Sequence, residues 1–181
     1  MKVKKINLDE IAAKMKSVLE FVLNEYALPV GGDHGIGHWA RVLENGVRLS
    51  ESSDADVDVV AAFAVIHDSQ RITEANDPDH GPRAALVASK NWELFGLSSS
   101  QAWMLITACD GHTTGRYYPN ATIQTCWDAD RLDLGRVGVT PDPDRLCTDA
   151  AQDEEFLEWA DQRACNLHVP PFVKKIWGIE L

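Results

Sequence analysis

Apolar side chains recur along most of this chain at intervals of three and four residues, the spacing that places them on one face of an α-helix. Residues 8–28 follow this spacing until Pro29-Val30-Gly31-Gly32-Asp33 interrupts it, and Asn7 with Glu10 forms a capping-box pattern at its start. Similar start and stop signals bound the later apolar patterns. We predict helices over about 8–28, 36–50, 54–66, 80–95, 98–110, 123–135 and 153–164.

One predicted helix is apolar on all sides rather than on one face. It begins at Asp54 or Asp56, and its residues 59–66 are all apolar. A helix of this kind is buried on every side, so we expect it at the centre of the core. Polar loops are predicted over 71–79 and 113–120, and no segment is a convincing strand.

The length and composition are those of one ordinary globular domain. The chain has 181 residues, of which 45% are hydrophobic and 25% charged, enough to close a core around a buried site. We therefore predict an all-α, single-domain helical bundle over 1–181. Its metal-site core covers about 34–135 and a C-terminal helical extension covers about 141–181, with no order assigned beyond Pro170-Pro171.

The charge balance restricts the partners. A net charge of −11 disfavours long nucleic acids and anionic membranes, which need basic surface. The longest apolar run is too short to span a bilayer, and the basic start Met1-Lys2-Val3-Lys4-Lys5 is followed by no apolar signal-peptide region. The four cysteines include no Cys-x-x-Cys pair, as expected for plain thiols in a reducing compartment. These features predict a cytoplasmic protein.

Histidines and aspartates are the candidate functional residues. Five of the six histidines fall between positions 34 and 112, and His67-Asp68 ends the apolar helix. A histidine at a helix end is more often a cap or a core residue than a ligand, and an acidic stretch is usually a solvated face. The position of Asp68 favours the interpretation as metal ligands. An unpaired carboxylate at the end of an apolar helix is costly, and a divalent cation would offset its charge.

The order of these residues resembles a known family. His38 lies in His38-Trp39-Ala40-Arg41-Val42, His67-Asp68 follows, and Asp130 lies in Ala129-Asp130-Arg131-Leu132. This ordered set, over about 34–135, is similar to the HD-domain superfamily of metal-dependent phosphohydrolases. The resemblance implies an all-α fold in which His38, His67, Asp68 and Asp130 bind a divalent ion (Mn, Fe, Co, Ni or Zn). His80 and His112 stand where some members hold a second ion, which Asp68 would bridge.

The resemblance also implies metal-dependent hydrolysis of a small phosphorylated substrate, for example a nucleotide, by a water activated at the metal. Asp68 or Asp130 would orient the water or take its proton, and His34 would protonate the leaving oxygen or hydrogen-bond the phosphate, unless it only caps its own helix. Arg71, Arg83 and Arg116 are the candidate phosphate-binding residues. Some nucleotidase-like members carry a catalytic Glu shortly after the His-Asp pair, whereas this chain has Ser69-Gln70-Arg71 and no acid before Glu74.

Two other functions are compatible with the same residues. The ligand order with two irons also resembles a diiron oxygenase branch of the superfamily. Alternatively, the bundle keeps its metal and binds a nucleotide without turnover, because a fold alone does not fix an activity.

Overall fold

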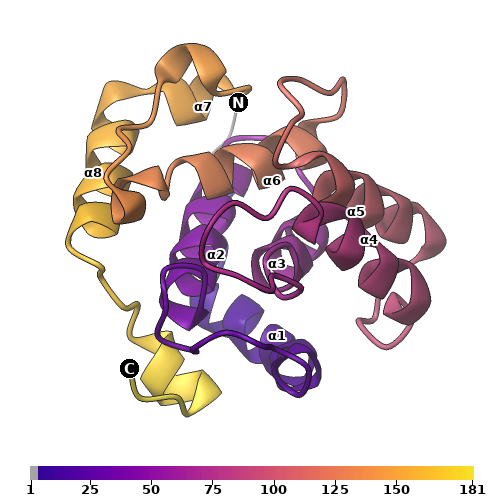
Figure 1. Ribbon diagram of the computed structural model, residues 1–181. Helices are drawn as coiled ribbons and strands as arrows, with labels where there is room; N and C mark the ends of the chain where they lie inside the picture. The colour runs from indigo at the N-terminus through magenta and orange to yellow at the C-terminus, as the bar shows by residue number, and fades with distance from the viewer. Residues whose placement is uncertain (1–3) are drawn as a thin grey trace.

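The computed structural model describes residues 4–181, which form helices and no strand. The predicted all-α fold is thereby confirmed, while Met1-Lys2-Val3, the first part of the basic N-terminus, lies outside the described residues. Figure 1 shows the arrangement of the helices. In chain order they are α1 (Leu8–Leu23), α2 (Ile36–Ser50), α3 (Val57–Ile66), α4 (His80–Asn91), α5 (Ser99–Gly111), α6 (Ala121–Arg131), the 3₁₀ turns η1 (Leu134–Val137) and η2 (Pro143–Arg145), α7 (Asp149–Gln152), α8 (Glu154–Cys165) and the π-helical turn η3 (Val173–Trp177).

Helix α3 is the centre of the core, as its apolar sequence predicts. Asp56 caps its N-terminus by accepting hydrogen bonds from the backbone N–H groups of Asp58 and Val59. All eight residues from 59 to 66 have no exposed surface, because α1, α2, α5 and α6 pack around this helix. The two residues that follow the C-terminal end of α3, His67 and Asp68, therefore lie in the interior.

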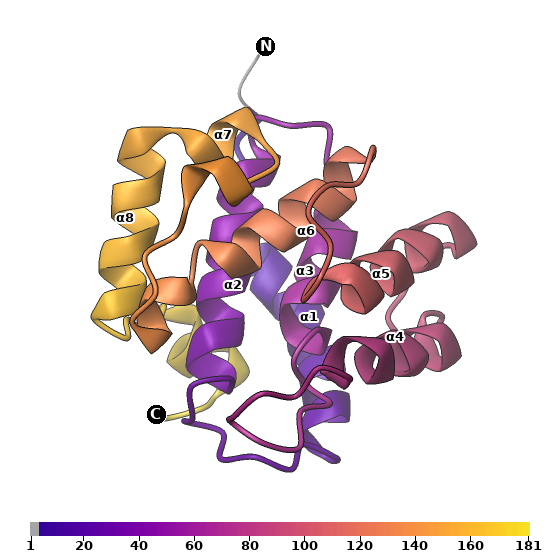
Figure 2. The same ribbon diagram turned by 45° about the horizontal axis from the view of Figure 1, so that its top comes forward.

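Helices α2 and α6 lie across one side of this core. Figure 2 shows α6 passing in front of α2, with α7 and α8 forming a separate edge of the molecule. The approach of α2 to α3 depends on Gly46, where an added Cβ would lie 2.4 Å from Cγ1 of Val60. The α2–α3 packing thus has no room for a methyl group at this position.

Helix ends differ from the prediction more than helix positions do. Helix α1 ends at Leu23 rather than near residue 28, because the backbone hydrogen bonds that follow join residues three apart instead of four. Tyr26 then packs edge-on against Trp39 and donates its hydroxyl to the carbonyl of His34 at 3.0 Å. These tertiary contacts stabilise a turn in place of the final helical residues.

Two other ends also differ. The predicted sixth helix stops at Arg131 and continues as the 3₁₀ turn η1. Helix α4 ends at Asn91, and the chain then turns at Gly96, whose φ of +71° suits glycine.

Ordered structure also continues past Pro170-Pro171. Trp177 of η3 is buried and donates its Nε1–H to the carbonyl of Ala12 at 2.9 Å, so the end of the described chain packs against α1. Over residues 4–181, every helix is either too short or too polar to cross a membrane.

Candidate metal centre

Six side chains from five helices converge at the inner end of α3. One comes from the first turn of α2 and two follow α3, while the others open α4, close α5 and lie in the last turn of α6. Five of them are buried, and the sixth, Asp130, has a side chain that is 18% exposed. They are His38, His67, Asp68, His80, His112 and Asp130.

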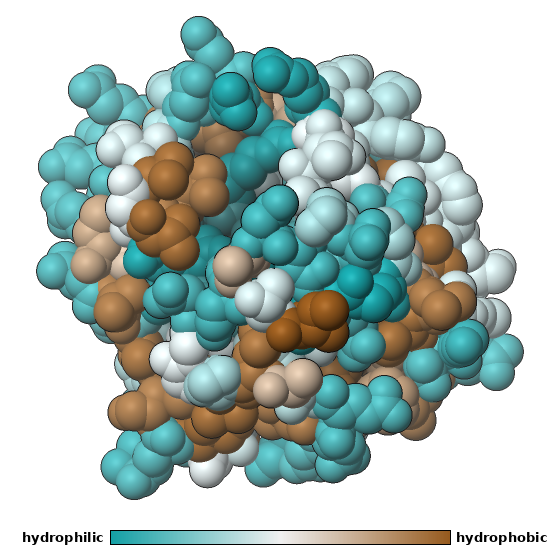
Figure 3. All heavy atoms as spheres, viewed as in Figure 1, coloured by the Kyte–Doolittle hydropathy of each residue, from teal (hydrophilic) through white to brown (hydrophobic). Residues whose placement is uncertain are grey.

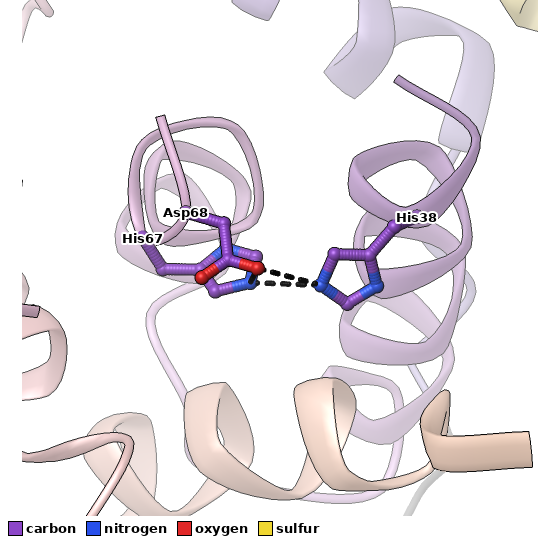
Figure 4. Close-up of side chains that lie close together, drawn as sticks. All are labelled: His38, His67 and Asp68. Carbon is purple, nitrogen blue, oxygen red and sulfur yellow. Dashed lines mark hydrogen bonds and ion pairs between the residues drawn. The ribbon is translucent and has the colours of Figure 1, made fainter. Parts of the chain in front are cut away.

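Four of these residues surround one point. The Nε2 atoms of His38 and His67 lie 3.0 Å apart. Oδ2 of Asp68 lies 3.5 Å from Nε2 of His38 and 3.8 Å from that of His67. Oδ1 of Asp130 lies 3.4 and 3.6 Å from the same two nitrogens. Figure 4 shows His38 pointing across from α2 toward the His67-Asp68 pair.

A second set of ligand atoms shares Asp68 with the first. Its other oxygen, Oδ1, lies 3.0 Å from Nε2 of His80 and 3.7 Å from Nε2 of His112. These two nitrogens are themselves 2.7 Å apart. Asp68 thus presents one carboxylate oxygen to each group, and both groups have a geometry that could hold a metal ion.

The other ring nitrogen of each histidine, Nδ1, is already bonded. Backbone carbonyls accept in three cases and a carboxylate in the fourth, so Nδ1 carries the proton and Nε2 is left with its lone pair in the neutral ring. The acceptors are Phe63 O for His67 (3.1 Å), Asp77 O for His80 (2.5 Å), Cys109 O for His112 (2.7 Å) and Asp133 Oδ2 for His38 (2.7 Å).

This bonding pattern tests whether a cation fits. Two Nε2 lone pairs that face each other at 3.0 or 2.7 Å cannot hydrogen-bond, and they repel unless a positive charge lies between them. Ligands bound at about 2.1 Å lie about 3.0 Å apart across an octahedral edge and about 3.4 Å apart in a tetrahedron. Most of the observed spacings are of this size, and the 2.7 Å between the two Nε2 atoms of the second group is slightly shorter, so the residues present could hold a divalent ion at each group.

The pKa values of the cluster show the same need for positive charge. Burial raises the pKa of Asp68 and of Asp130, but the neighbouring histidines outweigh it and hold both values below the usual range. Burial lowers the pKa of His67, yet the Asp68 and Asp130 carboxylates raise it overall. His38 is lowered to a pKa of about 4, chiefly by burial and then by the charge of Arg136. The carboxylates therefore remain anionic in the interior, where a cation would neutralise them.

Asp133 supports the first group from behind and was not predicted in this role. Its carboxylate accepts hydrogen bonds from Nε and Nη2 of Arg41 at 2.6 and 3.0 Å and from Nδ1 of His38 at 2.7 Å. Burial raises the pKa of Asp133, but His38 and Arg41 lower it overall. The only signal in the sequence is its position three residues after Asp130, which does not reveal the distant partners.

Helix α6 also contains a buried carboxylate that lies outside the centre. Asp128 accepts hydrogen bonds from the backbone N–H groups of Cys147 and Thr148, both at 2.8 Å. Its role is to fix the loop that follows η2.

The cluster forms the floor of a cavity of about 630 Å³. Its lining includes four residues of the cluster, Asp68, His80, His112 and Asp130, together with the aliphatic residues Leu134, Val137, Val139 and Leu146. The face viewed in Figure 3 is hollowed, with strongly hydrophilic side chains in the hollow and hydrophobic ones beside it. The volume is in the range of small-molecule sites.

His34 lines this cavity and is paired with an acid. Its Nδ1 lies 2.5 Å from Oε2 of Glu74, while Oε1 of Glu74 is buried without a hydrogen-bond partner among the described residues. Gly32 provides the space, since a Cβ there would lie 2.1 Å from Oε1. The alternative role of His34 as a helix cap is not observed, because Gly35 occupies the N-cap of α2 without a side-chain bond.

The three candidate phosphate-binding arginines lie in different surroundings. Arg71 is buried, lines the cavity and has an Nε atom without a partner among the described residues. Arg83 bonds instead to Asp77 at 2.6 Å and to the carbonyl of Gln70 at 3.0 Å. Arg116 lines a smaller cavity of about 200 Å³ next to the main one.

Comparison with protein-family models, with curated proteins and with solved structures gives no match to this chain. The resemblance to the HD-domain superfamily therefore depends on the ordered motifs of the sequence alone.

Proposed function

We propose that this protein is a metal-dependent phosphohydrolase of the HD-domain type that cleaves a small phosphate ester. One divalent ion would be held by His38, His67, Asp68 and Asp130, and a second by Asp68, His80 and His112. The observation that carries the proposal is Asp68, which lies between two pairs of imidazole nitrogens and gives one oxygen to each. Paired ions about 3.5–4 Å apart are the arrangement that phosphoryl-transfer sites use.

A bound divalent ion would supply positive charge for the phosphoryl oxygens and lower the pKa of a water. The chain's own part is to handle protons around that reaction. Asp130 is the most exposed member of the cluster and lies at the cavity floor, so its carboxylate can orient the attacking water and accept its proton. The water oxygen forms the new P–O bond, the ester P–O bond breaks, and the leaving oxygen needs a proton.

His34 is the residue that supplies this proton. Because Nδ1 is held by Glu74 at 2.5 Å, Nε2 is the free nitrogen of the ring. A carboxylate in this position fixes the ring orientation, as in hydrolytic triads. In this orientation His34 would donate a proton from Nε2 to the leaving oxygen, while Arg71 donates to the phosphate through its guanidinium group.

Elemental analysis followed by a panel of phosphate monoesters and diesters tests the proposal. The purified protein should contain one or two divalent ions per chain and should hydrolyse at least one ester class when that metal is supplied. His67→Ala and Asp68→Ala should each lose metal and activity, whereas His168→Ala, a histidine outside the cluster, should keep both. Full metal stoichiometry in the His67 and Asp68 variants would contradict the ligand assignment.

The same geometry favours one second candidate. Four histidines and a shared carboxylate around two adjacent positions also suit a diiron oxygenase. Iron as the native metal, with oxygen consumed and no ester hydrolysed, would support this candidate over the hydrolase. A nucleotide that raises the melting temperature but stays intact would instead indicate a binding module without turnover.

A further inference from the structure

The small cavity of about 200 Å³ beside the metal centre is lined by three guanidinium groups. Arg116, Arg131 and Arg145 contribute them, and Asp144 is the one acidic residue of the lining. In a chain with a net charge of −11, three arginines gathered at one hollow are a local concentration of positive charge, although Arg131 lies 3.9 Å from the buried Asp128 and Arg145 lies 3.6 Å from Asp142. Such a hollow is suited to an anion.

Two of these guanidinium groups are free to bind one. The side chain of Arg116 is exposed and forms no hydrogen bond or ion pair within residues 4–181. Among the described residues, the guanidinium of Arg145 is paired only with Asp142, at 3.6 Å, and both side chains of that pair are more than half exposed. An exposed pair of this length is weak, so an anion with good geometry can replace it.

Hydrogen bonds connect the loops that carry Arg116 and Arg145. The guanidinium of Arg131 donates to the carbonyls of Gly115 and of Arg145, and the thiol of Cys147 donates to the carbonyl of Arg116 at 3.3 Å. The buried Asp128 holds the backbone of Cys147 at 2.8 Å. These bonds use backbone atoms of the two loops. They therefore fix the positions of Arg116 and Arg145 while leaving the guanidinium groups available for a ligand.

The arginine cavity is continuous with the cavity above the metal centre. Thr113, Arg131 and Arg145 line both. The lining of the larger cavity also includes aliphatic residues, among them Val137 and Val139. A molecule that extends from one cavity into the other can therefore contact the ligand cluster, aliphatic surface and the arginines.

We propose that the small cavity is a second phosphate subsite, and that the substrate carries two phosphate groups joined by an uncharged body. One phosphate would lie at the metal centre for hydrolysis, which rests on the proposed function. The other would be bound by Arg116 and Arg145 and would stay intact, serving to orient the substrate.

Two binding measurements on the full-length chain test this proposal. The first titrates inorganic phosphate into EDTA-treated protein whose fold has been checked by circular dichroism. We expect saturable binding that weakens roughly tenfold or more in the double variant Arg116→Gln/Arg145→Gln, since each change removes charge-assisted hydrogen bonds. The control Lys174→Gln/Lys175→Gln removes the same charge from an exposed segment and should leave binding unchanged.

The second measurement compares adenosine 5′-monophosphate with adenosine 3′,5′-bisphosphate on the metal-loaded protein. The bisphosphate should bind about tenfold more tightly, and the double arginine variant should abolish that difference. Equal affinities in the wild type, or a difference that persists in the variant, would overturn the proposal. If the arginine-dependent pattern is found but no ester is ever hydrolysed, the proposed function fails while the phosphate subsite stands.

Discussion

Replacement of Asp133 by Asn is the most informative single change, because it removes one charge without changing the shape of the side chain. The carboxylate accepts three hydrogen bonds from two residues, two from Arg41 and one from His38. An amide has one oxygen, so the NH₂ group of Asn would face an N–H donor. Arg41 is only 4% exposed and would be left as a buried cation without its partner.

The expected loss of stability is large. Breaking a buried ion pair by removing one partner costs about 3–5 kcal/mol, against a total free energy of unfolding of about 5–15 kcal/mol for a typical domain. The metal centre should be affected as well, since Nδ1 of His38 loses the acceptor that orients its ring. Loss of such a supporting bond lowers metal affinity by about 10–100-fold.

Urea unfolding followed by circular dichroism, in the presence of EDTA, measures the first effect without a contribution from bound metal. Competition with a chromophoric chelator measures the second. The matched control is Asp58→Asn, which breaks the exposed pair with Lys14 and should cost about 1 kcal/mol or less. If Asp133→Asn were as stable as this control and bound metal normally, the supporting role of Asp133 would be refuted.

The pH dependence of the same variant has a definite sign. The pKa of Asp133 is lowered in the folded protein, so its stabilisation is fully present above the unfolded-state pKa of about 3.9 and is lost as the pH falls through the lower folded value. The difference in unfolding free energy between wild type and Asp133→Asn should therefore be constant near neutral pH and shrink below about pH 4. A difference that grew on acidification would contradict this assignment.

Three further outcomes are expected. Changing both His80 and His112 to Ala should lower the metal content by one ion per chain, and an unchanged content measured by elemental analysis would remove the second metal position. Glu74→Gln should lower kcat by about 10²-fold with little change in KM or metal content, because it removes the acid that orients His34; a change confined to KM would argue against this role. Gly46→Ala should lower the free energy of unfolding by about 1–3 kcal/mol in urea titrations, because its Cβ would lie 2.4 Å from Val60, and an unchanged midpoint would show that α2 and α3 can separate without cost.

Helix positions could be predicted from the sequence because apolar spacing and capping residues are local signals. Asn7, Asp56 and Ser98 each accept backbone hydrogen bonds at N-caps, although Asn7 accepts from Asp9 rather than in the capping-box arrangement expected with Glu10. Helix C-terminal ends were less accurate, since the end of α1 depends on Tyr26 reaching the carbonyl of His34 across a turn. That contact exists only once the chain has folded.

The candidate site divides in the same way. Residue types and order pointed to the six cluster residues, and the structure brings all six together. The hydrogen-bond acceptors that orient the histidine rings could not be predicted from the sequence. Three of the four Nδ1 acceptors are backbone carbonyls, which any residue provides. Asp133 lies 95 positions from His38, and no local pattern links residues so far apart.

Residues 59–66 of helix α3 are enclosed on every side, and His67 and Asp68 follow directly after its last residue, Ile66. Over its ten residues the axis advances about 15 Å, and each residue turns the next by about 100°. A small rotation or shift at its far end therefore re-aims both side chains at the near end. Changes in packing volume along α3, remote from any ligand, should therefore shift the side chains of His67 and Asp68 in a protein that still folds, and should weaken the binding of any ion held there.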